Sequence, residues 1–238
     1  MRFTAFYFLV LTFAWCSLLV GCAESGETTP EGAALGGSVT VALIDTGVPA
    51  KVDAFDGFDI DYDDSAPVGA HATMMLSVIL GVNASGAERI DAKTIRIKCY
   101  SVPNGGADGL AEAINQALTD KAQILSISMG IRVSSQRLEQ AVELATDSGV
   151  DVYAAAGNVP FLKADYPARL KGVISVGAID SNGAYWEDSC RDPIDLTALG
   201  VDVPAINERQ EVEYISGTSA ATAMAVRQKL ARDVSLTN

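Results

Sequence analysis

Three polar residues of different types could together perform hydrolytic chemistry: Asp45, His71 and Ser219. Attack of a hydroxyl group on an acyl carbon needs a base with a pKa near neutral to take the proton. It also needs a buried carboxylate that holds this base in the correct tautomer. His71 is the single histidine of the chain. The three residue types therefore predict acyl transfer, with Ser219 as nucleophile, His71 as base and Asp45 as the carboxylate that orients the base.

Each of these residues also has an ordinary structural interpretation. Ser219 precedes an apolar run and could cap a helix. Asp45 could belong to a strand-end turn in which Gly47 adopts a positive φ. His71 could be a hydrogen-bonded histidine at the start of a helix. The catalytic interpretation depends on a fold that brings the three side chains together.

From residue 38 onward, short apolar runs rich in Val and Ile alternate with amphipathic stretches. The apolar runs predict strands at 38–45, 94–102, 123–129, 150–157 and 172–179, and the amphipathic stretches predict helices at 71–81, 109–120, 134–149 and 218–234. This alternation predicts a three-layer α/β fold, in which a doubly wound, mainly parallel sheet carries helices on both faces. Reactive groups collect at the carboxyl ends of the strands in such sheets, and Asp45, His71 and Ser219 all fall there.

Four sequence blocks resemble the signature blocks of one family. They are VALIDTGV around Asp45, GAHAT around His71, AAAGN ending at Asn158, and GTSAATA around Ser219. In this order they are similar to the subtilisin-like serine proteases, and the resemblance covers residues 38–234. It implies a subtilisin-like fold, a triad of Asp45, His71 and Ser219, and an oxyanion-hole amide at Asn158.

The resemblance also implies where a peptide substrate binds. The segment ILSISMG looks like the family's substrate-binding strand, and DYPARLKGVISVGAIDSNG is similar to the segment that closes the specificity pocket. Asp165 takes the position at the floor of that pocket, where an unpaired carboxylate would favour Arg or Lys before the scissile bond. A solvated loop aspartate, or neutralisation by Lys163, is the alternative. The implied substrate-binding residues are Ser126, Ile127, Ser128, Ala155, Ala156, Gly157 and Asp165.

The sequence departs from the family pattern beside two of the catalytic residues. Val68-Gly69-Ala70 precedes His71 and Ala72 follows it, in place of the usual Gly and Thr residues. After Ser219, Ala220 stands where Met is frequent and Ala223 where Pro is frequent. These differences concern packing around the triad, and they leave the residues that transfer the proton in place.

Two further sets of residues could bind a metal or form a disulfide. The acidic run DAFDGFDIDYDD contains Asp61, Asp63 and Asp64, and GFDIDYDD resembles a calcium-binding segment of some subtilases. A structural calcium site and a solvated acidic loop are both consistent with it, and the chemistry itself requires no cofactor. Cys99 and Cys190 could form a disulfide in an exported protein or remain buried thiols.

The N-terminus has the features of an export signal. One Arg is followed by an apolar stretch from Ala5 to Val20, which is short for a membrane span. Leu19-Val20-Gly21-Cys22 resembles the lipobox of bacterial lipoproteins, which implies lipidation of Cys22. We therefore expect a signal peptide at 1–21, a flexible tether at 22–37 and a peptidase domain at 38–238.

The expected function is a serine endopeptidase that acts on peptides or proteins through an acyl-enzyme. The lipidated cysteine would hold it on the outer side of the bacterial cytoplasmic membrane or in the outer membrane. A net charge of −13 gives no electrostatic attraction to nucleic acid. The alternative function is a catalytically inactive lipoprotein of the same fold that binds extended peptides by strand addition beside ILSISMG.

Overall fold

The computed structural model describes residues 38–82 and 89–236. The predicted signal peptide, the tether and Cys22 lie outside the described residues. The elements in chain order are β1 (Val39–Asp45), a 3₁₀ turn (Asp53–Phe55), β2 (Asp59–Asp61), α1 (Ala70–Leu80), β3 (Ile95–Ser101), α2 (Ala107–Thr119), β4 (Ile124–Ile127), α3 (Gln136–Asp147), β5 (Asp151–Ala155), β6 (Ile174–Ile179), β7 (Leu196–Leu199), β8 (Val203–Ile206), β9 (Val212–Ile215) and α4 (Thr218–Leu236).

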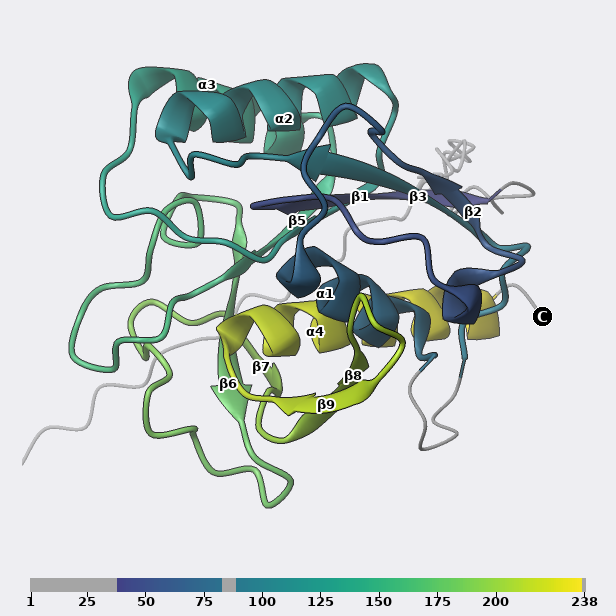
Figure 1. Ribbon diagram of the computed structural model, residues 1–238. Coiled ribbons are helices and arrows are strands. Elements are labelled where there is room, and N and C mark those ends of the chain that lie inside the picture. Colours follow the sequence, from purple (N-terminus) through teal and green to yellow (C-terminus); the bar gives the residue numbers. More distant parts are fainter. Residues whose placement is uncertain (1–37, 83–88, 237–238) are drawn as a thin grey trace, which may run out of the picture. The chain divides into compact units, whose positions relative to one another are not determined.

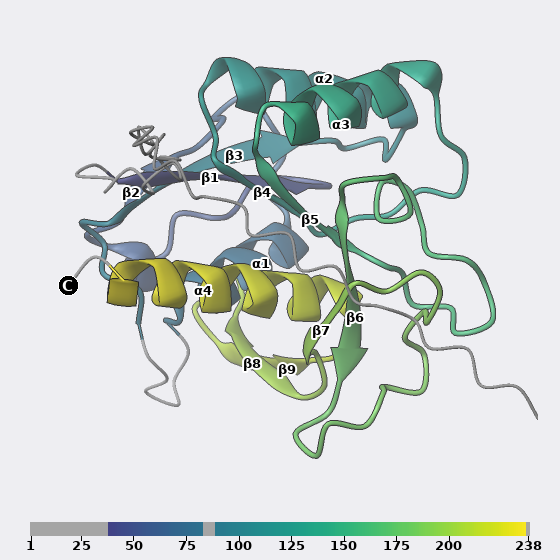
Figure 2. The same cartoon turned by 180° about the vertical axis from the view of Figure 1, so that it is seen from behind.

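Seven of the strands form one sheet in the order β2-β3-β1-β4-β5-β6-β7, and all of its neighbouring strands are parallel. Helices α2 and α3 cover one face, and α1 and α4 cover the other (Figures 1 and 2). The predicted three-layer, mainly parallel α/β fold is confirmed. Strands β8 and β9 form a separate antiparallel hairpin.

A hydrophobic core lies on each side of the sheet. Val41 and Leu43 of β1 belong to the core shared with α1 and α4, whereas Ala42 and Ile44 belong to the core beneath α2 and α3. Successive side chains of a strand point to opposite faces, so a strand between two helical layers needs apolar residues at every position. This explains the apolar run from Val41 to Ile44 within β1.

Helix α1 is buried on most sides, because it packs against both α4 and the β8–β9 hairpin. Eight of its eleven residues are buried. This environment selects the continuous apolar segment that follows His71 in the sequence. Among the described residues, no helix combines the length and the apolar character that a membrane span needs.

The catalytic candidates meet at one edge of the sheet. Asp45 is the last residue of β1, and Ser128 directly follows β4. Asn158 comes three residues after β5, while His71 and Ser219 are the second residues of α1 and α4. The carboxyl ends of parallel strands and the N-termini of the helices that follow them point to the same edge. This topology brings residues 174 positions apart in the sequence to one site.

Candidate active site

Asp45 and His71 are in direct contact. The Nδ1 atom of His71 is 2.9 Å from Oδ1 and 2.8 Å from Oδ2 of Asp45. Asp45 is fully buried, whereas the His71 side chain is 40% exposed. A carboxylate only accepts hydrogen bonds, so Nδ1 carries the proton and Nε2 of the neutral ring is left as an acceptor. The pair therefore presents a base on its solvent-facing side.

The surroundings of His71 set its basicity. Burial of the ring lowers the pKa of His71, but the hydrogen bond that His71 donates to Asp45 and the negative charge of Asp45 raise it, and the net effect is an increase. The carboxylate stabilises the imidazolium form, which is the form that results when His71 accepts a proton. Asp45 also accepts hydrogen bonds from the backbone N–H and the hydroxyl group of Thr46, which fix its orientation.

A close contact between two glycines positions the start of α1 beside Asp45. A Cβ atom on Gly47 would lie 2.9 Å from the backbone nitrogen of Gly69 and 2.9 Å from the Pro67 oxygen. The N–H of Gly69 donates to the Val48 oxygen at 2.8 Å. The alternative in which Gly47 adopts a positive φ does not hold, because Gly47 is absent from the positive-φ glycines of the described chain. Glycine is required there by the approach of the two segments.

Ser219 lies in the first turn of α4, where backbone N–H groups point out of the helix end. Its Oγ atom donates a hydrogen bond to the backbone oxygen of Ser128 at 2.9 Å. The nucleophile candidate is thus held against the end of β4. A rotation about χ1 moves the hydroxyl away from this carbonyl without any change of backbone.

Thr218 orients Asn158. The Oδ1 atom of Asn158 accepts from the Thr218 N–H at 3.0 Å and from the Thr218 hydroxyl at 2.8 Å. The Thr218 hydroxyl oxygen also accepts from the N–H of Gly157 at 3.0 Å. Oδ1 is occupied by these donors, and among the described residues the Nδ2 group of Asn158 donates to no protein atom, so it can donate to a substrate. The sequence interpretation missed Thr218, although its place between Gly217 and Ser219 was a usable signal.

Gly217 leaves room for that amide. A Cβ atom on Gly217 would lie 3.3 Å from Nδ2 of Asn158, and the residue has a φ of 158°. Asn158 itself is exposed, whereas Gly217 and Thr218 are buried. The donor therefore faces the open side of the site, and the groups that hold it are packed in the interior. This is the arrangement that a preorganised oxyanion donor requires.

The expected substrate-binding residues form the ends of two neighbouring strands. Ser126 and Ile127 lie on β4 and Ser128 follows it, while Ala155 ends β5 and Ala156 and Gly157 follow. β4 and β5 are parallel neighbours, so the two segments leave the sheet side by side. The hydroxyls of Ser126 and Ser128 are buried and have no hydrogen-bond partner among the described residues.

Asp165 does not have the unpaired carboxylate that the sequence interpretation assumed. Arg132 forms an ion pair with it through Nη1 and Oδ1. The proposed neutralisation by Lys163 is also wrong, because the Lys163 ammonium group pairs with Asp192 at 2.8 Å. Arg132 lies 33 positions before Asp165, and an antiparallel bridge between Ile131 and Tyr166 aligns the two segments.

Comparison with known proteins identifies the family. The model of the subtilase family, Peptidase S8, matches residues 36–227. The chain belongs to the subtilase family. Subtilisin BL of Lederbergia lenta is 30% identical to this subtilase over 198 residues, covering 79% of the chain and 73% of the relative. The thermostable alkaline protease of Halalkalibacterium halodurans is 29% identical over 201 residues, covering 79% of the chain and 54% of the relative.

Solved structures give the same result. The patellamide maturation protease PatA has a TM-score of 0.71 and 27% identity, and the match covers 82% of this subtilase and 78% of PatA. The prenylagaramide maturation protease PagA has a TM-score of 0.69 and 26% identity, with coverage of 79% and 72%. The chain spans about half the length of the curated relatives that it matches first, at 54% and 49%.

The three acidic residues considered for calcium have separate partners. Asp61 pairs with Lys98 at 3.2 Å, and Asp64 pairs with Lys51 at 2.8 Å. Asp63 accepts from the hydroxyl and the N–H of Ser65 at 2.5 and 3.0 Å, and these bonds lower the pKa of Asp63. Within residues 38–82 and 89–236, no three His, Cys, Asp or Glu side chains are grouped in a way that could hold a metal ion.

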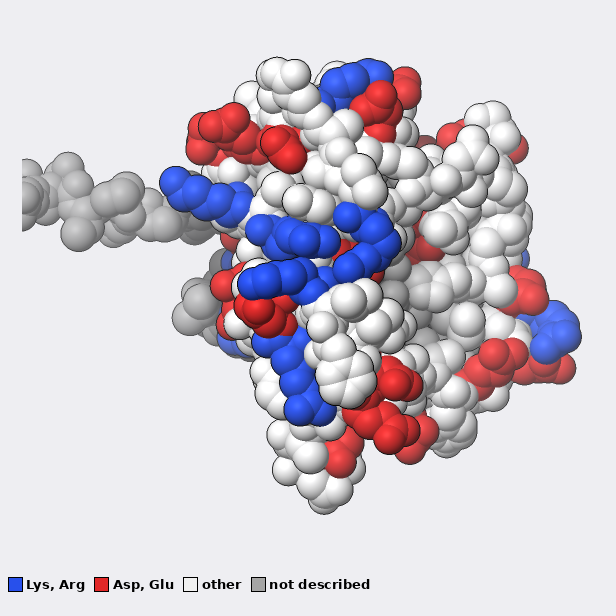
Figure 3. Space-filling model, turned by 90° about the vertical axis from the view of Figure 1, so that its left-hand side faces the viewer, with Lys and Arg blue, Asp and Glu red and all other residues white. Residues whose placement is uncertain are grey.

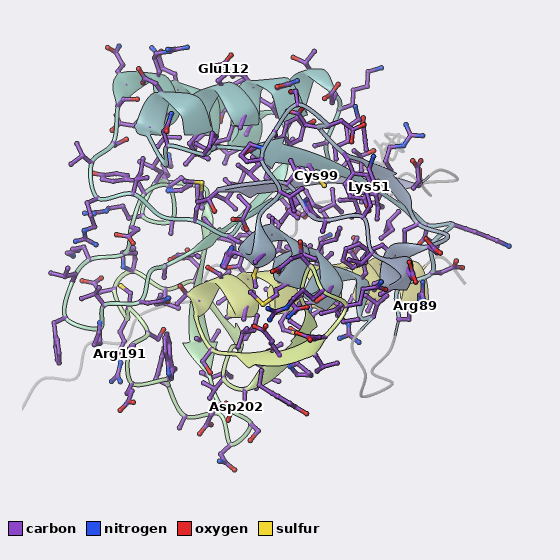
Figure 4. The ribbon with its side chains drawn as sticks, in the orientation of Figure 1. Lys51, Arg89, Cys99, Glu112, Arg191 and Asp202 are labelled. Atoms are coloured by element: carbon purple, nitrogen blue, oxygen red, sulfur yellow. The ribbon has the colours of Figure 1, made fainter. Side chains whose placement is uncertain are left out.

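The two cysteines of the subtilase domain are free, buried thiols, in agreement with the second of the two alternatives. Cys99 belongs to the core on the α1 and α4 side of the sheet, and Cys190 to the core on the α2 and α3 side. Figure 4 shows Cys99 well separated from Arg191, the neighbour of Cys190. Burial raises the pKa of the Cys99 thiol well above its ordinary value of 9.0.

Proposed function

We propose that this subtilase is a serine endopeptidase in which Asp45, His71 and Ser219 act as a catalytic triad. The observation that carries the proposal is the contact of His71 Nδ1 with the buried carboxylate of Asp45 at 2.8 Å. This contact fixes the tautomer whose Nε2 can take a proton. Ser219 and Asn158 lie at the same edge of the sheet, where a peptide carbonyl would meet them.

The reaction begins when Ser219 Oγ turns from the Ser128 carbonyl and attacks the carbonyl carbon of the substrate. The Ser219 proton moves to Nε2 of His71, and the imidazolium that forms is stabilised by Asp45. The developing negative charge on the substrate oxygen is stabilised by Nδ2 of Asn158 and by the backbone N–H of Ser219 at the start of α4.

His71 then gives the proton to the leaving amine, and the peptide bond breaks to leave an acyl-enzyme on Ser219. A water molecule attacks the acyl carbon in the second half of the reaction, with His71 again as the base. This sequence of steps is the one established for subtilisin-like proteases, and here it is assigned residue by residue to the matching positions of the chain. No cofactor enters it.

The test is labelling by a fluorophosphonate probe combined with hydrolysis of a fluorescent peptide library. We expect rapid labelling and turnover by the full-length protein, and loss of both in Ser219→Ala. In His71→Ala, turnover is expected to fall by several orders of magnitude, because the members of a triad act as a unit.

Ser181→Ala is the matched control, since Ser181 is exposed in the turn after β6. It should keep the turnover of the parent. If the folded parent is neither labelled nor able to cleave any peptide, the endopeptidase proposal is wrong. That result would favour the alternative of a peptide-binding protein with a subtilase fold.

We further propose that lipidation of Cys22 tethers this enzyme to a bacterial membrane, after export from the cytoplasm. The support is the sequence Leu19-Val20-Gly21-Cys22, which follows an apolar stretch and precedes a Gly-, Glu- and Thr-rich segment. Its substrates would then be peptides or proteins on the outer side of the cytoplasmic membrane or at the outer membrane.

A structural calcium ion at Asp61, Asp63 and Asp64 is a separate proposal. Binding of the ion there would require these three carboxylates to exchange their present partners for it.

A further inference from the structure

Two glycines near Ser219 and Asn158 stand against the side chain of Asp165, and we refer to the space beside these glycines as the slot. Gly130 comes two residues after Ser128, and Gly157 directly precedes Asn158. When a substrate carbonyl carbon meets Ser219 Oγ and its oxygen faces Asn158, the side chain of the residue that supplies this carbonyl lies next to both segments. A substrate bound in this way would place the side chain that precedes the scissile bond in the slot.

The carboxylate of Asp165 fills the floor of this slot. A Cβ atom on Gly130 would lie 2.6 Å from the Cβ atom of Asp165, and one on Gly157 would lie 2.6 Å from its Oδ2 atom. The backbone N–H of Asp165 donates to the Ala156 oxygen at 2.8 Å, which fixes the floor to the end of β5. A side chain that enters the slot would therefore meet the Asp165 carboxylate and the cation that pairs with it.

Arg132 covers that carboxylate. Its Nη1 atom bonds to Oδ1 of Asp165 and also donates to the backbone oxygen of Lys163 at 3.2 Å. Both interactions use the same nitrogen, and within the described part of the chain Nε and Nη2 of Arg132 donate to no protein atom. The Arg132 side chain is 49% exposed, against 17% for Asp165. The guanidinium group therefore keeps donors for an incoming group and is more exposed than the carboxylate that it pairs with.

A second arginine, Arg169, packs on the segment that is bridged to the residue before Arg132. The guanidinium group of Arg169 stacks over the ring of Tyr166 at 4.2 Å, and Tyr166 is the residue bridged to Ile131. The Nε atom of Arg169 is buried without a partner among the described residues. Figure 3 views the face at which α1 and α4 begin, and it shows Lys and Arg side chains gathered there although the chain has a net charge of −13.

We propose that Arg132 makes this slot selective for acidic side chains, so that the enzyme cleaves after glutamate or aspartate. The proposal rests on the endopeptidase function given above. A carboxylate in the slot would accept charge-assisted hydrogen bonds from the free donors of Arg132. Lysine or arginine would approach a guanidinium of like charge and find Asp165 already paired. A large apolar side chain would remove water from the ion pair without replacing its hydrogen bonds.

The experiment separates binding from cleavage. Peptides that differ only in one residue before the scissile bond, Glu, Gln, Ala or Lys, are titrated into Ser219→Ala by fluorescence anisotropy. In parallel, kcat/KM is measured for the parent on the same peptides. We expect the Glu peptide to exceed the Gln peptide about tenfold or more in both measurements, the usual effect of a hydrogen bond to a charged group.

Variants of Arg132 test the assignment. Arg132→Ala should lose the Glu preference and gain a preference for Lys, because Asp165 then lacks its cation. Arg132→Gln, which keeps most of the side chain, should also lose the Glu preference and serves as the second variant if Arg132→Ala does not fold. Arg137→Ala is the matched control, since Arg137 is an exposed arginine on α3 that pairs with Asp108, and it should keep the preference.

The inference is overturned if Glu and Gln peptides bind equally, if Lys is preferred by the parent, or if a folded Arg132 variant retains the Glu preference. Its failure differs from failure of the proposed function. Selective binding of the Glu peptide by Ser219→Ala together with an inert, unlabelled parent would refute the endopeptidase function and support the preference of the slot for acidic side chains. Efficient cleavage without any Glu preference would support the endopeptidase function and refute the preference for acidic side chains.

Discussion

Gly200 packs against Gly217 and Ala221, on either side of the candidate nucleophile in the sequence, and adding a single methyl group at Gly200 should destabilise the protein. Gly200 is buried after β7, and its oxygen accepts a hydrogen bond from the N–H of Gly217 at 2.7 Å. A Cβ atom on Gly200 would lie 2.7 Å from the Cβ of Ala178, 2.8 Å from the Gly217 oxygen and 2.9 Å from the Cβ of Ala221. None of these three neighbours can rotate away.

The magnitude follows from this geometry. Overpacking a close-packed site costs about 1–3 kcal/mol of the free energy of unfolding. Because relief in Gly200→Ala requires the backbone at Gly217 or the sheet at Ala178 to move, we expect about 2–3 kcal/mol. With a urea dependence of about 2–3 kcal/mol per molar, the unfolding midpoint should fall by about 1 M. Thr218 and Ser219 follow Gly217, so hydrolysis should fall as well.

Equilibrium urea unfolding followed by circular dichroism measures this effect, in a Ser219→Ala background to prevent self-digestion. Gly106→Ala is the matched control. Gly106 has a φ of −89°, and a Cβ atom there would have nothing within 4 Å. Glycine is a better N-cap residue than alanine, which lowers the stability of Gly106→Ala, whereas alanine reduces the conformational entropy of the unfolded chain, which raises it. The two effects oppose each other, so the unfolding midpoint should hardly change. Equal midpoints for Gly200→Ala and Gly106→Ala would refute the packing argument.

Three other predictions concern catalysis and location. The kcat/KM of the parent should fall as the pH drops through the raised pKa of His71, because only the neutral ring accepts a proton. In Asp45→Asn the residual kcat/KM should fall at a lower pH than in the parent, since burial without the carboxylate lowers the pKa of His71. If kcat/KM falls at the same pH in the parent and in Asp45→Asn, this role of Asp45 is contradicted. Asn158→Ala should lower kcat by about a hundredfold or more with little change in KM, the loss measured for the oxyanion donor of subtilisin, and an effect confined to KM would instead indicate ground-state binding. Cys22→Ser should move the protein out of the membrane fraction, whereas retention after a carbonate wash would indicate an uncleaved anchor.

Much of the fold was predictable because its signals are local. The Val- and Ile-rich runs indicated β1, β3, β4, β5 and β6, since strands buried on both faces carry near-continuous apolar runs; the first half of β3, where Arg96 is exposed, alternates instead. The amphipathic stretches gave α2 and α3. Strands β2 and β7 and the β8–β9 hairpin were missed, because they are only three or four residues long and all but β8 are largely outside the buried core. At that length, apolar periodicity does not distinguish a strand from a loop.

The sequence by itself also determined which residues could carry the chemistry. Asp45, His71 and Ser219 follow from the residue types at the ends of predicted elements, and the order of the four blocks points to the subtilase family. The contact between Asp45 and His71 is a consequence of parallel topology, in which all of these ends share one edge. In this part of the site, local sequence and overall architecture lead to the same arrangement.

Only the tertiary structure decided the electrostatics of the slot. From the sequence, Asp165 appeared unpaired or neutralised by Lys163, its neighbour two residues away. The structure pairs it with Arg132, which is brought across 33 positions by the bridge between Ile131 and Tyr166, and it pairs Lys163 with Asp192. The state of a charge depends on every group within a few ångströms of it, and those groups come from segments that meet only in the folded chain.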